Sequence, residues 1–211
     1  MPESDIRSVG AAAAGHYGIS VTGATLSSVI VSAAWNVQGN PAGAAFVNGV
    51  QRLFDVPLPV VPNTTTRGTT TRGNDLVALW LGPRSWLLVE TAAAGERSGL
   101  DDFAAKRDAV NASGGALFDV SASRVAFRIS GLQAARILAK SCPLDFHPDA
   151  FAVGQCAQSL FGRVGALFYR PDATPTFLML VARSFSHDSW KLLCRTAAQY
   201  GYDVKAPHAL A

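Results

Sequence analysis

The sequence is poor in charged residues, and this shortage limits the classes of protein it can belong to. Charged residues make up 16% of its 211 residues, against about 25% in an average soluble domain. The net charge is +3, and the basic residues are scattered along the chain. No basic stripe of the kind that binds nucleic acid is present. Together with 49% hydrophobic residues, the low charge favours a surface that is partly covered by another molecule.

Long apolar runs are also missing. The longest strongly apolar run, Phe177–Ala182, is far shorter than the ~20 residues of a helix that crosses a bilayer, so we expect no contact with a membrane. The first residues carry Glu3 and Asp5 before a short alanine run, unlike the basic start and apolar centre of a signal peptide. We therefore expect a cytoplasmic protein in which residues 1–22 form a flexible tail.

Cysteine is scarce and no glycine-rich phosphate motif occurs. The three cysteines, Cys142, Cys156 and Cys194, show no Cys-x-x-Cys spacing, so neither a disulfide framework nor a zinc site is predicted. We expect them to act as small buried apolar residues. Because Gly-x-Gly-x-x-Gly after a strand and Gly-Lys-Ser/Thr are both absent, no nucleotide-binding loop is predicted.

The histidines do not form a recognisable metal or catalytic pattern. His16, His147 and His208 lack a second ligand three or four residues away on a shared helical face, so no metal site is predicted. The run His187-Asp188-Ser189 contains the letters of a nucleophilic triad, but consecutive helical residues point about 100° apart. Ser186 and Asp188 suit the N-terminus of a helix instead.

The segment 117–124, LFDVSASR, is the strongest candidate for chemistry. Asp119 and Ser121 place an acid and a hydroxyl directly before a predicted strand. Short side chains of this kind also bond local backbone N–H groups and fix a turn, and we interpret both residues as structural. From the residues alone we predict no catalytic, cofactor-binding or metal-binding side chain in this chain.

Four helices and seven strands are predicted from caps and apolar spacing. The helix starts are Asn40 with Pro41, Ser98, Ser130 with Gln133, and Ser186. The helices end before Pro57, at Gly114-Gly115, before Pro143 and at Gly201. Strand-like runs lie at 26–37, 76–81, 86–89, 125–129, 157–161, 164–169 and 177–181.

Landmarks in the first half of the chain recur in the second half. Gly39 and Gly131, 92 residues apart, each lie between a strand and a helix, and the caps Ser98 and Ser186 are 88 residues apart. Such recurrence indicates a duplication. We predict an α+β fold of duplicated α/β halves, with mixed, mainly antiparallel sheets packed with helices. Residues 23–211 would form a single domain of two repeats, at about 26–113 and 116–204.

One low-complexity segment, TTTRGTTTRG at 64–73, carries Arg67 and Arg72 on a β-prone strip broken by glycine. Two interpretations remain open. The strip is a hairpin or edge loop, or it is a docking site for an anion or for an acidic patch of a partner.

Several motifs together resemble a known family. The segment 117–146, LFDVSASRVAFRISGLQAARILAKSCPLDF, resembles part of the folate-binding domain of the glycine-cleavage aminomethyltransferases, or T-proteins. A wider set is similar to the gamma subunits of heterotetrameric sarcosine oxidases, over about residues 26–204. That set comprises Gly39-Asn40-Pro41, PLP at 57–59, LWLGPRSWLL at 79–88, the DVS segment, and ARSFSHDSW at 182–190.

The resemblance implies a T-protein-like fold and a non-catalytic structural subunit of a sarcosine-oxidase-type flavoenzyme complex. Such a complex oxidatively demethylates sarcosine to glycine and forms hydrogen peroxide and methylenetetrahydrofolate. The resemblance implies no cofactor in this chain, with FAD, FMN and NAD held by partner subunits. The implied partners are the alpha, beta and delta subunits, of which alpha is the direct contact.

The residues also leave alternatives. In T-proteins the hairpin after the matching helix carries a carboxylate that assists folate-dependent transfer, whereas Gly165-Ala166 stand at that place here. Ala182 stands where an asparagine is usual. A stand-alone folate-binding aminomethyl or methyl transferase would need another acid, Asp119 or Glu90. A third possibility is a small binding module that uses the strip at 64–73.

Overall fold

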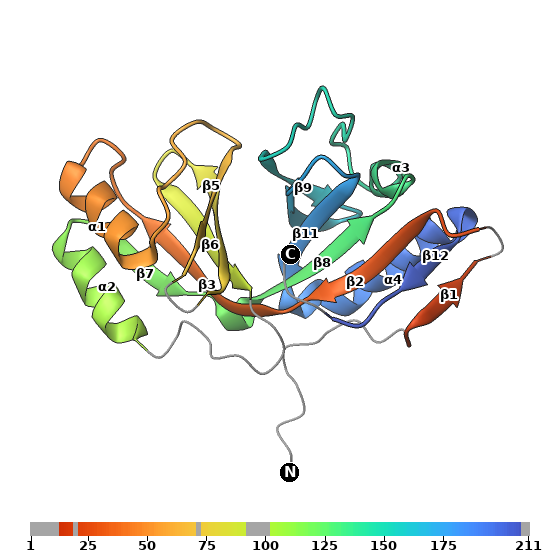
Figure 1. Cartoon of the computed structure of the whole chain (residues 1–211), viewed down its shortest axis with the longest axis horizontal. Helices are drawn as coiled ribbons and strands as arrows, with labels where there is room; N and C mark the ends of the chain where they lie inside the picture. Colours follow the sequence, from red (N-terminus) through yellow and green to blue (C-terminus); the bar gives the residue numbers. More distant parts are fainter. Residues whose placement is uncertain (1–12, 19–20, 71–72, 92–101, 208–211) are drawn as a thin grey trace, which may run out of the picture. The chain divides into compact units, whose positions relative to one another are not determined.

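The computed structural model describes residues 13–18, 21–70, 73–91 and 102–207, which form two compact units. One unit comprises residues 31–122, and the other comprises residues 13–30 together with 123–207. Each unit contains one β-sheet and two α-helices (Figure 1). The chain therefore enters the second unit, leaves it for the first, and returns.

The unit of residues 31–122 is built on a five-stranded sheet. Its elements are β3 (Val31–Gln38), α1 (Ala44–Phe54), β4 (Thr65–Thr69), β5 (Asp75–Gly82), β6 (Ser85–Thr91), α2 (Phe103–Ala112) and β7 (Ala116–Asp119). The strand order is β4-β5-β6-β3-β7, and every neighbouring pair is antiparallel. The short helix η1 (Ser121–Ser123) follows β7.

The unit of residues 13–30 and 123–207 is built on a seven-stranded sheet. Its strands are β1 (Gly15–Tyr17), β2 (Ala24–Val29), β8 (Arg124–Ser130), β9 (Cys156–Phe161), β10 (Val164–Tyr169), β11 (Thr176–Ala182) and β12 (Tyr202–Val204). Its helices are α3 (Ala134–Ala139), η2 (Arg183–Phe185), α4 (Ser186–Ala197) and η3 (Ala198–Tyr200). The order is β1-β12-β2-β8-β11-β10-β9, antiparallel except for the parallel pair of β12 and β2.

The two sheets repeat one arrangement. Without β1 and β2, the larger sheet reads β12-β8-β11-β10-β9, which matches β7-β3-β6-β5-β4 in the smaller sheet. The difference is that β2 lies between β12 and β8, whereas β7 pairs directly with β3. The predicted fold class, with duplicated halves and mainly antiparallel sheets packed with helices, is confirmed.

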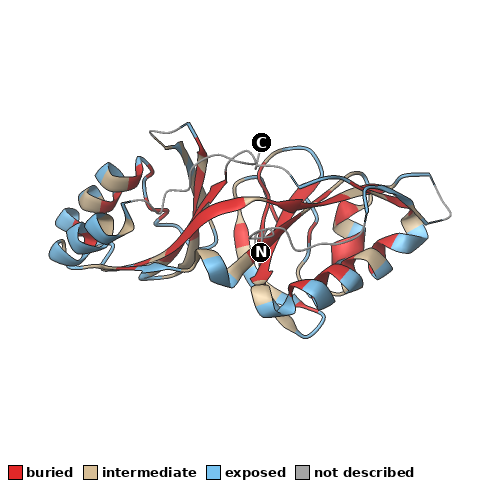
Figure 2. Cartoon of the chain, turned by 90° about the horizontal axis from the view of Figure 1, so that it is seen from below, coloured by how far each residue is buried: buried red, intermediate tan, exposed pale blue. Residues whose placement is uncertain are grey.

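The core of residues 31–122 lies between its sheet and its helices. Phe46, Val50 and Phe54 follow each other at four-residue spacing on α1, so they lie on one side of the helix. They pack with Trp35 of β3 and Trp86 of β6. Burial of each such side chain contributes about 1.5–3 kcal/mol. Figure 2 shows the same division on the helices, with buried residues on one side and exposed residues on the other.

The core of the other unit is rich in aromatic residues. Trp190 and Leu193 of α4 pack with residues of the sheet such as Phe127. Phe146, which follows α3, makes edge-to-face contacts with three phenyl rings at 5.2–5.8 Å, those of Phe151, Phe168 and Phe177. This geometry is favoured by the ring quadrupoles. Cys142 and Cys156 are buried, as predicted, whereas Cys194 is partly buried, and all three are free.

The strand expected at 26–37 is wrong as a single element. Residues 24–29 form β2 and residues 31–38 form β3, and these two strands belong to different sheets. The apolar run is continuous through Ile30, so composition alone could not reveal the change of hydrogen-bonding partner. Pairing with β8 on one side of Ile30 and with β6 and β7 on the other divides the run.

Three predicted helix caps are also wrong. Asn40 accepts the N–H of Ala42 at 3.1 Å, and α1 begins only after Gly43. Ser130 is the last residue of β8 and pairs with two neighbouring strands. Ser186 is the first residue of α4, and its hydroxyl donates to the carbonyl of Arg183 at 2.7 Å. In each case a hydrogen bond within the local loop or within the sheet replaces the predicted capping hydrogen bond. The fourth cap, Ser98, lies outside the described residues.

One segment that was predicted to be a flexible tail and one that the sequence left open are placed in the sheets. Residues 15–17, within the segment expected as a tail, form β1 and pair with β12. Residues 65–69 of the Thr/Arg strip form β4, an edge strand paired with β5, while Arg72 lies outside the described residues. Among the helices that the structure describes, none has the length and hydropathy to cross a membrane.

Phe46 is held between two glycines, and this packing gives a test of the core. A Cβ added at Gly115 would lie 2.4 Å from Cε2 of Phe46 and 2.9 Å from the carbonyl oxygen of Gln38. We expect Gly115→Ala to lower the free energy of unfolding by about 1–3 kcal/mol, because an overpacked core must shift. The measurement is urea denaturation. The matched control is Gly82→Ala, since no atom lies within 4 Å of a Cβ there, and equal effects of the two variants would contradict the packing.

Candidate functional site

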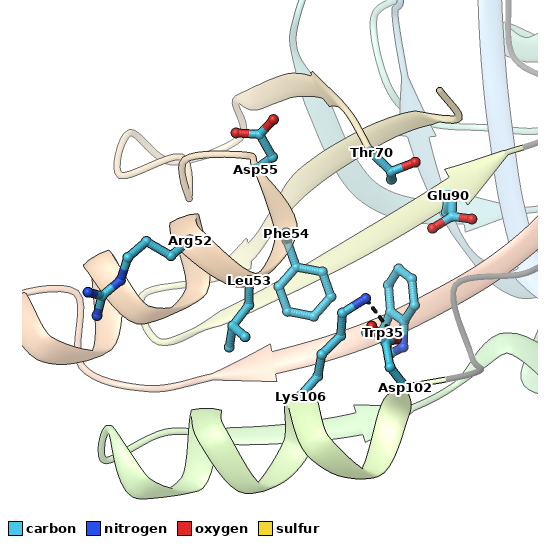
Figure 3. Close-up of a pocket in the computed structure, with 9 residues that line it drawn as sticks. All are labelled: Trp35, Arg52, Leu53, Phe54, Asp55, Thr70, Glu90, Asp102 and Lys106. Atoms are coloured by element: carbon cyan, nitrogen blue, oxygen red, sulfur yellow. Dashed lines mark ion pairs between the residues drawn. The ribbon is translucent and has the colours of Figure 1, made fainter. Parts of the chain in front are cut away.

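The unit of residues 31–122 contains a small cavity of about 70 Å³. Its lining comes from both helices, from the strands β3 and β6, and from the loop after β4 (Figure 3). The lining residues are Trp35, Arg52, Leu53, Phe54, Asp55, Thr70, Glu90, Asp102 and Lys106. Three of these are acidic and two are basic, so charges of both signs meet at the cavity.

Lys106 lies against the two aromatic rings that line the cavity, those of Trp35 and Phe54. Its Nζ lies 3.0 Å from Oδ1 of Asp102, one helical turn earlier. The same Nζ lies over two rings, 5.5 Å from the centroid of Trp35 and 5.2 Å from that of Phe54. The spacing of four residues, acid before base, is the favourable order on a helix. This spacing is the signal in the sequence for the pair, which was not among the predicted features.

Glu90 places a carboxylate in the interior beside the cavity. The residue is 2% exposed. Its Oε1 accepts a hydrogen bond from Nδ2 of Asn74 at 2.8 Å, and the hydroxyl of Ser32 lies 3.3 Å from the same oxygen and 3.0 Å from the Glu90 carbonyl. A buried carboxylate needs such partners. Glu90 is therefore tied to neighbouring strand and loop residues.

The chemistry of the cavity is limited by its size and its lining. A volume of about 70 Å³ has room for only a few water-sized molecules. The indole N–H of Trp35 has no hydrogen-bond partner in the described part of the chain, so it could donate to a small acceptor. The lining contains no histidine or cysteine, and its hydroxyl, on Thr70, accepts the N–H of Asn74 at 3.1 Å. This arrangement does not provide an activated nucleophile with its base.

Asp119 and Ser121 fasten the end of β7 to β3. Oδ1 of Asp119 accepts the N–H of Ser121 at 2.9 Å and its hydroxyl at 2.6 Å. The Ser121 oxygen in turn accepts the N–H of Ala34 at 2.8 Å, and the N–H of Val120 donates to the Ala34 carbonyl at 2.9 Å. Asp119 therefore bonds a local backbone group, as predicted, whereas the backbone partner of Ser121 is Ala34 on the neighbouring strand β3.

The run His187-Asp188-Ser189 is not brought together as a triad. His187 and Asp188 are exposed on the first turn of α4, whereas Ser189 is buried at 2% exposure. Asp188 lies at the positive end of the helix dipole, where an acid is stabilising. These positions support the role at a helix N-terminus.

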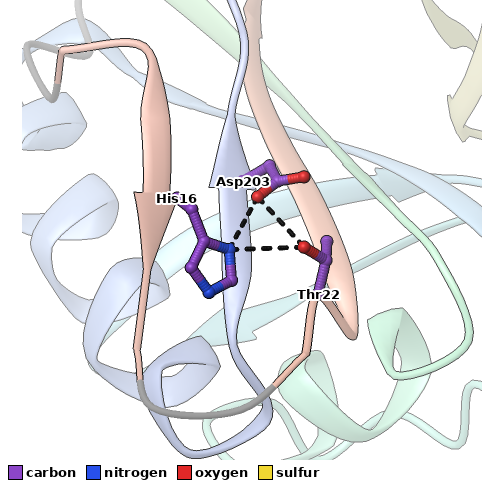
Figure 4. A network of polar contacts seen from close by, with 3 residues as sticks. All are labelled: His16, Thr22 and Asp203. Atoms are coloured by element: carbon purple, nitrogen blue, oxygen red, sulfur yellow. Dashed lines mark hydrogen bonds and ion pairs between the residues drawn. The ribbon is translucent and has the colours of Figure 1, made fainter.

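His16 forms a small polar network at the edge of the larger sheet (Figure 4). Its Nδ1 lies 2.8 Å from Oδ1 of Asp203 and 3.3 Å from the hydroxyl of Thr22, and the hydroxyl donates to Asp203 at 3.1 Å. Because both partners meet the same ring nitrogen, the network is not a catalytic relay, which needs one partner on each nitrogen. The hydrogen bond from His16, with that from Thr22, lowers the pKa of the Asp203 carboxyl.

The other sequence candidates lie apart from one another. Nδ1 of His147 lies 3.5 Å from Asp149 in an exposed loop, and His208 lies outside the described residues. Within the ranges that the structure describes, no three metal-ligating side chains gather into a group. Gly165 is exposed on β10, Ala166 beside it is buried, and Ala182 ends β11. The hairpin of β10 thus presents no carboxylate at 165 and 166.

The chain matches one protein family over most of its length. The family model described as "Sarcosine oxidase, gamma subunit family" matches residues 38–199. A sarcosine oxidase subunit gamma from Arthrobacter sp is 37% identical over 92 residues, which cover 44% of this chain and 42% of the relative. One from Corynebacterium sp. (strain P-1) is 31% identical over 109 residues, or 52% and 51%. The chain spans about half the length of the curated relatives it matches.

Two solved structures share the fold. A chain of the heterotetrameric sarcosine oxidase from Corynebacterium sp. U-96 matches with a TM-score of 0.70 and 22% identity, over 87% of this chain and 88% of that chain. The glycine cleavage system aminomethyltransferase T from Bartonella henselae matches with a TM-score of 0.59 and 15% identity, over 89% of this chain and 48% of that chain. Both likenesses concern the fold.

The network of His16 gives a test of pH dependence. Because the pKa of Asp203 is lowered in the folded state, its contribution to stability is present above the unfolded pKa of about 3.9 and is lost as the pH falls through the folded pKa. We expect His16→Ala to return the pKa of Asp203 towards its ordinary value. The measurement is an NMR titration of the carboxyl carbon. A wild-type value that persists in His16→Ala would contradict the assignment, and Asp149 in the same spectra serves as the control.

Proposed function

Because the chain belongs to the sarcosine oxidase gamma subunit family, we propose that it is a non-catalytic structural subunit of a sarcosine-oxidase-type flavoenzyme complex. The proposed complex oxidatively demethylates sarcosine to glycine and forms hydrogen peroxide and methylenetetrahydrofolate. The match of the family over residues 38–199 is the observation that carries the proposal.

The contacts of the acidic candidates support a structural role. Asp119 is occupied by Ser121 at the end of β7, and Glu90 is bound by Asn74. The place of the T-protein carboxylate is taken by Gly165 and Ala166. A catalytic acid has to reach a substrate, and these two carboxylates hold protein groups instead.

In this proposal the redox chemistry belongs to partner subunits. FAD, FMN and NAD bind in the other chains, the partners are the alpha, beta and delta subunits, and alpha is the direct contact. The complex is cytoplasmic. Neighbouring apolar side chains at the surface support burial against a partner, since such residues mark interaction sites when they gather. Val60 and Val61 are adjacent in the chain and are 69% and 59% exposed.

Co-expression tests the proposal. We expect the tagged chain to co-elute from size exclusion with flavin-bearing subunits and to show no flavin absorbance when it is expressed alone. In the assembled complex we expect Glu90→Gln to leave sarcosine turnover unchanged, because Glu90 does not touch substrate in this proposal. Elution of the wild-type chain by itself would contradict the subunit role. Loss of turnover in a fully assembled Glu90→Gln complex would contradict the non-catalytic role.

A second candidate is a stand-alone folate-binding aminomethyl or methyl transferase. The fold shared with aminomethyltransferase T and the buried carboxylate of Glu90 favour it. The cavity beside Glu90, at about 70 Å³, is far below the ~300 Å³ at which pockets for drug-sized ligands begin. The cavity therefore favours the subunit role.

Calorimetry separates the two candidates. We expect no heat of binding when tetrahydrofolate is titrated into the isolated chain, because the cavity is too small for a pterin. Binding that is abolished by Glu90→Gln and retained by Asp119→Asn would establish the transferase-like alternative at the cavity. The circular dichroism spectrum of each variant controls for loss of folding.

A further inference from the structure

The strand β4 forms one edge of the five-stranded sheet, and its hydrogen bonds with β5 follow a regular pattern. At one end the N–H of Trp80 donates to the carbonyl of Thr64 at 3.2 Å. At the other end the N–H of Thr70 donates to the carbonyl of Asn74 at 2.8 Å. Because bonded residues alternate along an antiparallel strand, the residues of β4 that bond β5 are the even-numbered ones.

The backbone groups of Arg67 and Thr69 therefore point away from β5, towards the free edge of the sheet. Among the described residues, none of these two N–H and two C=O groups has a hydrogen-bond partner. Both residues are exposed, so another molecule can reach the groups. A row of unpaired backbone groups on an exposed edge is a template for a further strand.

The side chain of Arg67 adds a positive charge to this edge. In the part of the chain that the structure describes, Arg67 forms no ion pair. Its neighbour across the sheet is the apolar Val77, and the nearby acid on β5, Asp75, lies opposite Thr69 instead. The guanidinium of Arg67 is therefore available to an acidic group that approaches along the edge.

Two exposed apolar side chains lie at the start of the same strand. They are Val60 and Val61, at 69% and 59% exposure. The hydroxyl of Thr64, the residue directly before β4, donates to the carbonyl of Val61 at 2.7 Å. This bond holds the apolar pair beside the strand. Unpaired backbone groups, an unpaired cation and apolar side chains thus occur together along one edge.

A second copy of this chain is a poor occupant of the edge. Two-fold pairing of two β4 strands through Arg67 and Thr69 would place the two guanidinium groups opposite or diagonal to each other. Like charges that face each other across a strand pair are destabilising, whereas an acid that faces Arg67 is stabilising. The charge of Arg67 therefore disfavours self-association and favours an acidic strand.

We propose that the outward backbone groups of Arg67 and Thr69, here called the β4 edge, pair with an extended segment of a partner subunit that carries an aspartate or glutamate opposite Arg67. The inference rests on the proposed function. In strand addition of this kind, main-chain hydrogen bonds provide affinity and side chains at alternate positions provide specificity. Residues 65–69 of the Thr/Arg strip are then part of an interface between subunits.

Hydrogen exchange resolved at single amides tests this pairing. In the isolated chain we expect fast exchange at Arg67 and Thr69 and slow exchange at Gly68, whose N–H bonds β5. In the assembled complex the amides of Arg67 and Thr69 should exchange more slowly by about tenfold or more, with Gly68 unchanged as the internal control. Fast exchange of both amides in the complex would overturn the inference and leave the proposed function intact.

Two further outcomes of the exchange experiment are decisive. Slow exchange at Arg67 and Thr69 that depends on the concentration of the isolated chain would overturn the inference, since it would show pairing with a second copy. Failure of the wild-type chain to assemble with the other subunits would overturn the proposed function itself.

A charge reversal tests the acidic partner. We expect Arg67→Glu to raise the dissociation constant for the remaining subunits by about tenfold, because a repulsive cross-strand pair replaces an attractive one. The matched control is Arg84→Glu, since Arg84 is exposed in the turn between β5 and β6 and carries the same charge. We expect the control to bind like the wild type. Equal binding by the two variants would overturn the inference.

A proline substitution tests the backbone contribution. Proline has no N–H and is tolerated on an edge strand where that group faces outward. Thr69→Pro should weaken binding by about five- to tenfold through loss of one hydrogen bond, whereas Thr69→Ala keeps the backbone and should bind like the wild type. Equal binding by Thr69→Pro and Thr69→Ala would contradict strand addition. Circular dichroism checks the folding of both variants, and the comparison of Arg67→Glu with Arg84→Glu does not depend on either.

Discussion

Hydrogen bonding along both edges of β3 and β8 is the constraint on which the rest of the structure depends. β3 pairs with β6 and β7, and β8 pairs with β11 and β2. A central strand must satisfy its N–H and C=O groups on both sides, so each of these strands fixes the register of two others. The helices then cover the sheet face that carries Trp35 in one unit and Phe127 in the other. The cavity lies on the helix-covered face of the smaller sheet, since Trp35 and Glu90 alternate in step with the core residues of β3 and β6.

The sequence predicts the class of fold because its main signals are local. Phe46, Val50 and Phe54 lie at helical spacing, and the strands β10 and β11 appear as short apolar runs preceded by Gly162 and Pro175. The errors arise where pairing with a strand far away in the sequence determines the element to which a residue belongs. Nothing in the run 26–37 shows that its two parts pair in different sheets, and nothing around Ser130 shows that β8 continues through it. Strand pairing over large sequence separations overrides cap preferences at such places.

The candidate sites show the same limit. The role of Asp119 and Ser121 could be predicted, because the partners of both residues include groups only two positions away. The cavity could not, because Trp35, Glu90 and Lys106 come from three elements that the fold brings together.

The placement of β2 has a consequence for the order in which the chain folds. Every strand of residues 31–122 pairs within that segment, whereas both neighbours of β2 in its sheet, β8 and β12, come later in the chain. Residue Thr25 meets Ser130 across the sheet, a contact that closes a loop of about a hundred residues, and such closure is slow. On the ribosome, where the N-terminal part appears first, β2 waits unpaired while the segment after it completes its own sheet. The unit of residues 31–122 can thus complete its sheet before the strands that pair with β2 have been synthesised.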